Sequence, residues 1–263
     1  MMQFKNQSSS HQKVFLSLKN VSKKYAQRNS ESNTVLENIN IQILDGEIIT
    51  ILGKSGCGKS TLLNLIAGFE NPFGGEILLN GKPVKDISPE RIMMFQESAL
   101  FPWLTAFQNV EFALKMAKVP KYQREKQAKH YLKTVGLSDY SNSYIHQLSG
   151  GMKQRVSLAR ALSLNPKILL MDEPFAALDI TIKKTLYKEL LNLHKKTRKT
   201  ILFVTHNINE AVLLGDRVIV MSPQLYGIKN EYVIGIPKEQ RNDNNPIIKN
   251  IINQITSDLY ENN

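Results

Sequence analysis

The spacing of apolar residues changes along the chain from a strand period to a helix period. Apolar residues alternate with polar ones in two places within residues 14–50, and this predicts strands there. The alternating positions are Val14, Leu16, Leu18, Ile39, Ile41 and Ile43. Residues 47–52 then form a strand-like apolar run, and residues 62–67 have the pattern of a helix. A strand-rich part therefore leads into a strand, a loop and a helix.

Helical patterns dominate residues 97–153, and helix-like and strand-like runs alternate over 154–222. Before them, the Gly74-Gly75 pair predicts a turn and the Asn80-Gly81 pair predicts a hairpin. Alternating strands and helices are typical of a parallel α/β sheet. We therefore expect one α/β domain at 14–222, with an antiparallel β subdomain at its N-terminus and a helical subdomain inserted at 97–153.

Residues 223–263 are predicted to form a C-terminal tail. This tail is mostly polar, but its end carries an amphipathic pattern made by Ile247, Ile248, Ile251, Ile252, Ile255 and Leu259. We expect a short helix there that packs on the core or on a partner.

A glycine-rich loop after the run at 47–52 carries the first chemical signal. It matches the phosphate-binding pattern G-x-x-x-x-G-K-[ST] over Gly53, Lys54, Ser55, Gly56, Cys57, Gly58, Lys59, Ser60 and Thr61. The glycines let backbone N–H groups and the helix N-terminus face anionic phosphates. Lys59 can reach the β- and γ-phosphates, and the Ser60 hydroxyl can ligate Mg²⁺. The chain is therefore predicted to bind a nucleoside triphosphate.

A second apolar run, at 168–171, ends in the carboxylates Asp172 and Glu173. Its length suits a strand buried in a parallel sheet, and the carboxyl ends of such strands are where α/β folds place ligands. Asp172 is predicted to hold Mg²⁺, mostly through water. Glu173 is predicted to accept a proton from the attacking water or to orient it. Beside a phosphate loop, these roles are favoured over a solvated acidic turn.

The third signal is Leu148-Ser149-Gly150-Gly151, which precedes a helical pattern at 156–162. Ser149 can cap this helix, and Gly150 and Gly151 leave its first amides bare. A second glycine-rich helix start suggests a second anion site. Because one chain offers no obvious second phosphate, the expected ligand is the nucleotide of a partner chain.

With these motifs in this order, nearly all of residues 14–222 resemble the ATP-binding subunits of ABC transporters, whose distinguishing signature is L-S-G-G. The resemblance implies a P-loop NTPase fold with a RecA-like core and an ATPase that uses ATP and Mg²⁺. It also implies a head-to-tail dimer, ABC permease membrane subunits as partners and, indirectly, a solute-binding protein. The implied location is peripheral, on the cytoplasmic face of the cell membrane.

Further roles follow from this resemblance alone. Gln96 resembles the loop glutamine that contacts Mg²⁺ and the attacking water, and His206 resembles the histidine that contacts the γ-phosphate. Tyr25 resembles the aromatic residue that stacks on adenine, for which a flat ring suffices. Ala177-Leu178-Asp179 resembles the loop along the dimer seam, although Asp179 could equally cap the following helix.

Three positions depart from the family pattern. Met152 stands where Gln is most frequent, so only the backbone is expected to act there. Asn207 follows His206 where Asp is usual, which removes a charge that could pair across the dimer seam. The polar stretch at 26–34 is expected to lengthen a hairpin loop next to Tyr25.

Composition sets further limits. The chain has 263 residues, a formal net charge of +11 and one cysteine, Cys57, which suits a reducing cytoplasm. Basic runs at 115–133 and 183–199 overlay helical patterns, so solvated helix faces explain them, with attraction to an anionic leaflet as a secondary effect. No groove-reading motif accompanies this charge, and we expect no nucleic-acid partner. No apolar run reaches 18 residues, and the first ten residues lack the apolar part of a secretory signal.

A narrower resemblance concerns residues 91–110, above all Phe95-Gln96-Glu97 and Leu100-Phe101-Pro102-Trp103-Leu104. This segment looks like the corresponding loop of the nitrate, sulfonate and taurine import group. The implied solute is a small anion, with an aliphatic sulfonate first and nitrate or a vitamin precursor as alternatives. The cluster at 101–104 either receives a short helix of a membrane subunit or, with equal weight, belongs to the core of the helical lobe.

Two other functions stay open on the sequence alone. One is a non-transport ATPase of the same superfamily that acts on ribosomes or DNA, and the other is the ATPase subunit of an exporter. Members of the first class usually carry two such domains, a long coiled coil or zinc-spaced cysteines, and this chain shows none of these.

Overall fold

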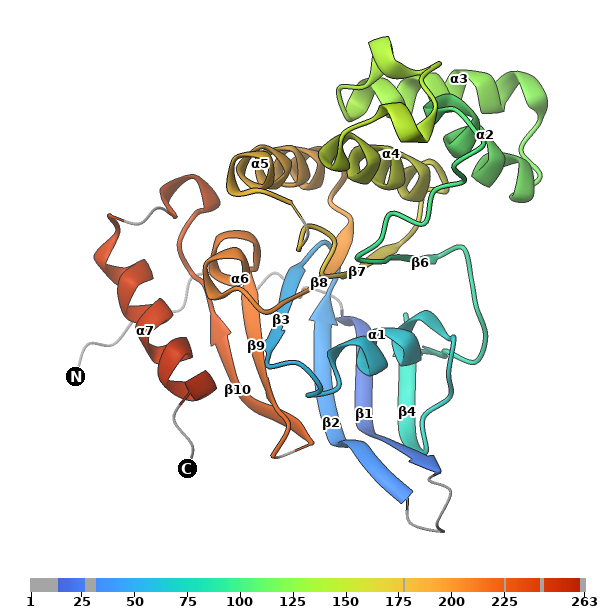
Figure 1. Cartoon of the computed structure of the whole chain (residues 1–263). Coiled ribbons are helices and arrows are strands. Elements are labelled where there is room, and N and C mark those ends of the chain that lie inside the picture. Colours follow the sequence, from blue (N-terminus) through green and yellow to red (C-terminus); the bar gives the residue numbers. More distant parts are fainter. Residues whose placement is uncertain (1–13, 27–31, 177, 225, 242–243, 261–263) are drawn as a thin grey trace.

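Two β-sheets lie on either side of helix α1 (Lys59–Ala67) in the computed structural model of the chain (Figure 1). The structure describes residues 14–26, 32–176, 178–224, 226–241 and 244–260. The first sheet has the strand order β2-β1-β4-β5 and is antiparallel throughout. Its strands are β1 (Val14–Ala26), β2 (Ser32–Leu44), β4 (Gly74–Leu79) and β5 (Lys82–Pro83). Part of the polar stretch at 26–34, residues 27–31, falls outside the described residues.

The second sheet has the order β10-β9-β3-β8-β7-β6, and all of its neighbours are parallel except β10 and β9. Every residue of β3 and β8 is buried, as expected for parallel strands covered on both faces. The strands are β3 (Ile48–Gly53), β6 (Arg91–Met94), β7 (Ile168–Asp172), β8 (Thr200–Thr205), β9 (Arg217–Ser222) and β10 (Gly227–Val233). Strand β3 is central, so the loop that follows it lies between its neighbours β8 and β9.

Alternate residues of the parallel strands face two different cores. Ile168 and Leu170 of β7 pack with α1 and the antiparallel sheet. Leu169 and Met171, one residue out of step, pack with the helices on the other face. The side-chain period of two therefore sorts one apolar strand into both layers.

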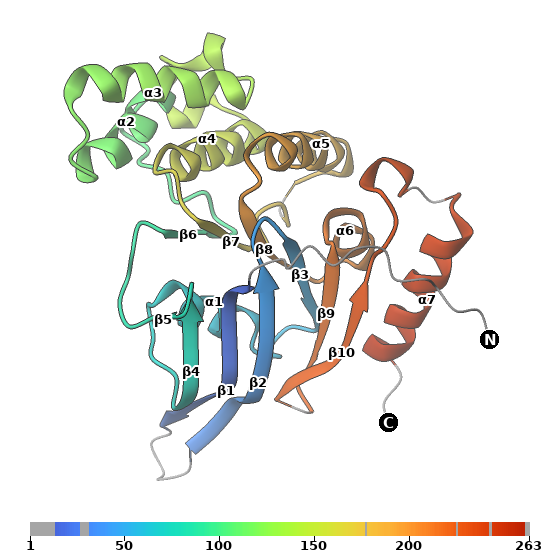
Figure 2. The same ribbon diagram turned by 180° about the vertical axis from the view of Figure 1, so that it is seen from behind.

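The helices on that other face form a separate lobe and a covering layer (Figures 1 and 2). The lobe contains α2 (Ala106–Met116), α3 (Lys121–Thr134), the short 3-10 helices η1 (Ser138–Tyr140) and η2 (Ile145–Gln147), and α4 (Gly150–Ser163). Helices α5 (Ile180–Thr197) and α6 (Ile208–Leu214) follow β7 and β8. The 3-10 helix η3 (Lys238–Gln240) precedes α7 (Pro246–Tyr260), which lies beside β10. None of the helices in the described ranges is long and apolar enough to cross a membrane.

Several local predictions are confirmed. The chain is an α/β protein with an antiparallel sheet before the parallel one and helices between β6 and β7. Asn80 and Gly81, both with positive φ, form the tight turn that pairs Leu79 with Lys82. The amphipathic pattern near the C-terminus forms α7, whose Ile248 and Ile255 pack on β9 and α6.

Two features differ from the sequence-based expectations. Strand β10 lies in the segment predicted to be a polar tail with only a helix, because an antiparallel edge strand needs few apolar side chains. Gly74-Gly75 begins β4 rather than forming a turn. The register of β1 against β4 shifts between Lys19 and Ser22, opposite these glycines. A Cβ on Gly75 would lie only 2.3 Å from the Asn20 carbonyl oxygen, so glycine is required for this irregularity.

The packing of α7 predicts the effect of two matched substitutions. Ile255 is fully buried in the α7 contact with the sheet, whereas Ile247 on the same helix is mostly exposed. Ile255→Ala is expected to destabilise the docked helix by about 2–4 kcal/mol, through lost burial and the cavity left behind. Ile247→Ala should change it by less than about 0.5 kcal/mol. Hydrogen exchange of the α7 amides measures both, and equal protection in the two variants would contradict this packing.

Candidate functional site

The phosphate loop joins the end of β3 to the start of α1. Gly56 and Gly58 have φ angles of 82° and 95°, which side chains rarely adopt. A Cβ on Gly58 would also lie 2.6 Å from a methyl carbon of Leu36. No side chain caps α1, whose N-cap residue is Gly58. The first amides of the helix are therefore left without a side-chain acceptor, which favours an anion at this end.

The ammonium group of Lys59 lies inside this loop. Lys59 is only 6% exposed, and its Nζ donates to the carbonyl oxygens of Gly53 (2.8 Å) and Lys54 (3.1 Å). Its Nζ also lies 3.9 Å from Oε1 of Glu173. The loop is thus folded around a positive charge that can exchange carbonyl partners for phosphate oxygens.

The loop also buries the single cysteine. Cys57 is 2% exposed, and its Sγ would be 2.5 Å from a Cβ placed on Gly53. Burial raises the pKa of its thiol, which keeps it protonated. These contacts are those of a small residue that fits a tight loop.

Strand β7 brings two carboxylates to the same edge of the sheet. Burial raises the pKa of Asp172, although the nearby Ser60 hydroxyl acts in the opposite direction. Glu173 follows with a φ of 44°. Its Oε2 lies 2.9 Å from Nδ1 of His206, the residue after β8. Because β7 and β8 are parallel neighbours, with Asp172 beside Val204, their ends place Glu173 against His206.

Tyr25 lies near the end of β1, within reach of α1. Its hydroxyl donates to Glu70 (2.7 Å), and burial and this bond raise the Tyr25 pKa. The side chain of Thr61, in the first turn of α1, lies close enough to act on the Tyr25 pKa in the opposite direction. Lys23 pairs with Glu70 at 2.9 Å and lies over the Tyr25 ring, 5.0 Å from its centroid. The ring is therefore held next to the phosphate loop.

The segment after Gln96 is held by the helix that carries the Ser149 motif. Gln154 of α4 donates from Nε2 to the Gln96 carbonyl oxygen (2.8 Å). Arg160, two turns further along α4, donates to the carbonyl oxygens of Ser98 (3.2 Å) and Ala99 (2.8 Å). Burial lowers the pKa of Arg160. No sequence pattern pointed to Gln154 or Arg160, because their partners are backbone atoms more than 50 residues away.

The Ser149 motif forms the N-terminus of α4, as predicted. The Ser149 hydroxyl accepts a hydrogen bond from the Met152 amide (3.3 Å). A Cβ on Gly151 would lie 2.6 Å from a methyl carbon of Ile182, so Gly151 allows α4 to pack closely on α5. No hydrogen bond or ion pair between described residues joins Ser149, Gly150 or Gly151 to the phosphate loop. The N-termini of α1 and α4, the two helix starts suited to anions, are therefore not bonded to each other within one chain.

The remaining predicted positions act locally. Asp179 caps α5, since its Oδ1 accepts from the amides of Thr181 and Ile182, each at 3.0 Å. Asn207 caps α6 by accepting from the Glu210 amide (3.0 Å). Leu178 is described, but Ala177 lies outside the described residues.

Glu210 is a polar residue of this region that the sequence analysis missed. It is 7% exposed and accepts hydrogen bonds from Thr205 and Tyr187. The pair Asn207 and Glu210 has the spacing of a helix capping box, a signal that could have been noticed. The Glu210 side chain instead turns toward β8 and α5.

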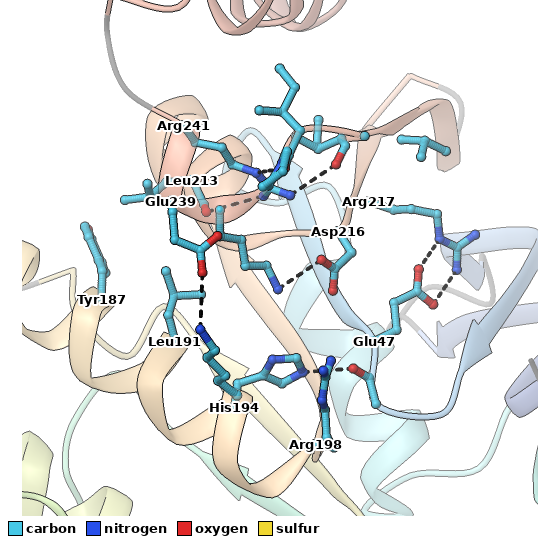
Figure 3. A pocket seen from close by; sticks show the side chains of 18 of the residues that line it. Glu47, Tyr187, Leu191, His194, Arg198, Leu213, Asp216, Arg217, Glu239 and Arg241 are labelled. Carbon is cyan, nitrogen blue, oxygen red and sulfur yellow. Dashed lines mark hydrogen bonds and ion pairs between the residues drawn. The ribbon is translucent and has the colours of Figure 1, made fainter. Parts of the chain in front are cut away.

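A cleft of about 1400 Å³ opens elsewhere, between α5, the turn before β3 and the segment after β10 (Figure 3). Its charges pair across the walls: Lys238 with Asp216 (2.9 Å), Lys195 with Glu239 (3.7 Å) and Arg217 with Glu47 (2.5 Å). Arg241 donates to backbone carbonyl oxygens, among them that of Ile236. No phosphate-loop residue lines this cleft. These bonds tie the C-terminal segment to the core.

The fold and the phosphate loop define the class of protein as a P-loop NTPase. The family described as "ABC transporter" matches residues 36–176, more than half of the chain. The protein therefore belongs to the ABC transporter family, and it is an ATP-binding ATPase. This confirms the family resemblance and the ATPase activity inferred from the motifs.

A solved relative supports the fold. A dimeric ATP-binding cassette in a post-hydrolysis state, bound to ADP and Pi, is 34% identical to this chain. The match covers 84% of this chain and all of the other, with a TM-score of 0.73. The predicted P-loop NTPase fold with a parallel-sheet core is confirmed.

Three curated relatives are named as ATP-binding proteins of import or transport systems. A taurine import ATP-binding protein of Roseobacter denitrificans is 43% identical, covering 82% of this chain and 81% of its own. A bicarbonate transport ATP-binding protein of Synechocystis is 46% identical, covering 80% and 74%. A nitrate import ATP-binding protein of Synechocystis is 44% identical, covering 83% and 82%. The predicted similarity to the nitrate, sulfonate and taurine import group is confirmed.

Substitutions of the two lysines of the phosphate loop are expected to affect ATP binding differently. Lys59→Ala should weaken ATP binding by about tenfold or more, because a hydrogen bond to a charged group contributes about 1.5–3 kcal/mol. Lys54→Ala should have a smaller effect, since the exposed Lys54 ammonium lies over the Tyr260 ring, 5.4 Å from its centroid. Calorimetric titration with ATP tests both. Unchanged affinity in Lys59→Ala would contradict the placement of phosphates at this loop.

Proposed function

We propose that this chain is the ATP-hydrolysing subunit of an importer for a small anion. The observation that carries the proposal is the line of contacts from Lys59 to Glu173 (3.9 Å) and from Glu173 to His206 (2.9 Å), next to bare helix amides. These groups suit the binding and hydrolysis of a terminal phosphate. The relatives named for taurine import and nitrate import support the import direction, and those named for bicarbonate and nitrate support an anionic solute.

Each predicted residue has a role in this proposal. The loop from Gly53 to Thr61 binds the phosphates, with Lys59 facing the β- and γ-phosphates. Tyr25, which lies beside Thr61, stacks on adenine. Glu173 takes the proton of the attacking water or orients it, and His206 contacts the γ-phosphate.

The residues predicted to hold Mg²⁺ fit this ion. Ser60 lies close enough to Asp172 to lower its pKa, so a hydroxyl and a carboxylate lie next to each other. Mg²⁺ prefers oxygen ligands and is usually held by one or two carboxylates together with substrate phosphates. When bound, the ion would neutralise charge on the β- and γ-phosphates. Gln96 is the third proposed ligand, and a hydrogen bond from α4 holds its segment in place.

Two copies of the chain complete the site. Within the described part of the chain, no hydrogen bond or ion pair joins Ser149, Gly150 or Gly151 to the phosphate loop of the same chain, yet they form a capped helix start with bare amides. In a two-fold head-to-tail dimer, this helix start of one copy closes over the γ-phosphate held by the other. The dimeric state of a solved relative agrees with this arrangement.

The surface for a membrane subunit is proposed around Trp103. Trp103 is 70% exposed, which favours an interface over the alternative of a place in the core of the helical lobe. Phe101 beneath it packs against Phe112, with ring centroids 4.9 Å apart. Asn109 fixes this loop by accepting from the Phe101 amide (2.9 Å) and donating to its carbonyl oxygen (3.1 Å). A rigid loop that presents an aromatic side chain suits an interface with a permease helix.

Bound to these permease subunits, the chain would lie peripherally on the cytoplasmic face of the membrane. A solute-binding protein would be an indirect partner of the chain. The basic runs at 115–133 and 183–199 would add a secondary attraction to anionic lipids. Nucleic acid is not a proposed partner. A non-transport ATPase and an exporter subunit remain the alternatives, and co-purification with a permease and a solute-binding protein would separate them from an importer.

The composite site predicts a trapped dimer. Glu173→Gln should keep ATP binding and lower kcat by at least about 100-fold, because the amide keeps its shape but cannot accept a proton. ATP should then shift this variant from monomer to dimer in light scattering. Adding Ser149→Arg should prevent the shift, since a bulky cation replaces the helix cap. Near-normal turnover of Glu173→Gln, or dimerisation that survives Ser149→Arg, would contradict the assigned roles.

The proposed import of a sulfonate predicts a growth phenotype. Deletion of the gene should abolish growth on an alkanesulfonate as the sole sulfur source, and expression of the intact chain should restore it. The Lys59→Ala chain serves as the control that should fail to restore it. Normal growth of the deletion strain on sulfonates, with a defect on nitrate, would move the proposal to nitrate. A defect on an unrelated nutrient would overturn the small-anion assignment and leave the ATPase standing.

A further inference from the structure

Glu210 is a buried carboxylate that none of the roles above requires. It lies in the first turn of α6, four residues after His206. Its Oε2 accepts a hydrogen bond from the Thr205 hydroxyl (2.5 Å), and its Oε1 accepts one from the Tyr187 hydroxyl (2.5 Å). Lys183 places its Nζ 3.4 Å from Oε1. A buried charge is costly unless it is paired and hydrogen-bonded, so this cluster is a specific arrangement.

The cluster holds both neighbours of His206. Thr205 precedes His206 and donates its hydroxyl proton to Glu210. Asn207 follows His206, its side chain accepts from the Glu210 amide (3.0 Å), and its own amide donates to the Thr205 hydroxyl oxygen (3.0 Å). The Thr205 side chain is therefore bonded to Glu210, and the Asn207 backbone is bonded to the hydroxyl that Glu210 orients.

His206 itself has little other support. Its side chain is 59% exposed, and its ring is hydrogen-bonded to Glu173. The direction of an exposed side chain is set mainly by the backbone that carries it. A change in the loop of Thr205, His206 and Asn207 would thus move the ring relative to Glu173 and to a phosphate at the loop.

The donors to Glu210 from outside this loop come from α5. Lys183 and Tyr187 are one turn apart on that helix, so both reach the same carboxylate. Burial and Glu210 raise the pKa of Tyr187, so its phenol remains protonated and donates. The direction of every hydrogen bond in the cluster is therefore defined, and hydrogen bonds in such a chain strengthen one another.

We propose that Glu210 is a positioning residue for ATP hydrolysis: together with Tyr187 and Lys183 it fixes the loop that aims His206. The inference rests on the proposed roles of Glu173 and His206. None of the hydrogen bonds and ion pairs of Glu210 among the described residues reaches the phosphate loop or Tyr25, so it is expected to set the turnover rate and to leave nucleotide affinity almost unchanged.

Tyr187→Phe is the mildest test, because it removes one hydroxyl and keeps the ring that packs on Phe175, 5.9 Å away between centroids. We expect kcat to fall about tenfold while the Kd for ATP changes by less than about twofold. Tyr232→Phe is the matched control. The Tyr232 hydroxyl also donates to a carboxylate at 2.5 Å, that of Asp258 on α7, far along the chain from His206. Its kcat should match that of the unchanged protein.

A double-mutant cycle then asks whether Glu210 acts through His206. Glu210→Gln should lower the single-turnover hydrolysis rate about tenfold in the unchanged protein and less than about twofold in a His206→Ala background. The His206 ring signal in NMR, assigned by its loss in His206→Ala, should shift in Glu210→Gln and in Tyr187→Phe. Tyr232→Phe should leave it in place.

Several results would overturn the inference. Losses that multiply fully in the double mutant would show that Glu210 acts independently of His206. A parallel loss of ATP affinity, or the same loss of kcat in Tyr232→Phe, would indicate a general structural role. Failure of the proposed function looks different, because then Glu173→Gln and His206→Ala themselves would retain hydrolysis.

Discussion

The buried ammonium group of Lys59 is the interaction around which the rest of the site is arranged. An unpaired charge at 6% exposure would be strongly unfavourable, so the loop supplies the carbonyl oxygens of Gly53 and Lys54 within 3.1 Å. Glu173 adds an opposite charge at 3.9 Å. The same three features make the loop a stable turn without ligand and leave a cation in place for a phosphate. The stability of the loop and its readiness to bind phosphate therefore have the same cause, the buried ammonium group of Lys59.

The parallel sheet supplies the other groups at the correct edge. Strands β3, β7 and β8 point in one direction, so their last residues lie at the same edge of the sheet. These residues, Gly53, Asp172 and Thr205, are more than 30 residues apart in sequence. Each strand is buried on both faces and has little freedom to slide, because a shift by one residue would exchange the two cores on either side of the sheet. The distances between Lys59, Glu173 and His206 are therefore consequences of core packing.

Much of this arrangement could be predicted from local sequence patterns. The loop at 53–61, the carboxylates at the end of β7 and the cap at Ser149 each depend on a few adjacent residues, and the structure has these elements where the patterns place them. The similarity to known transporters indicated Tyr25, Gln96 and His206, which no local pattern singles out. Their proposed roles remain predictions.

The parts that could not be predicted depend on contacts between distant segments. Strand β10 carries too few apolar residues to be recognised, and it is a strand because β9 offers it an edge. Exposure of Trp103 is decided by how Asn109 folds the preceding loop back. Glu210 accepts a hydrogen bond from Tyr187, 23 residues earlier, on a different helix. Sequence spacing does not encode such tertiary hydrogen bonds.

Helix α5 touches two of these regions at once. Its Ile182 packs on Gly151 at the start of α4, and its Lys183 and Tyr187, on the neighbouring face, bond to the carboxylate beside the His206 loop. In the proposed two-fold dimer, Gly151 serves the ATP of the partner, whereas His206 serves the ATP of its own chain. A rigid rod of 18 residues would then join the two nucleotides of the dimer. Closure of the dimer at one ATP site would therefore move residues at the other site, and the two ATP sites would be mechanically coupled.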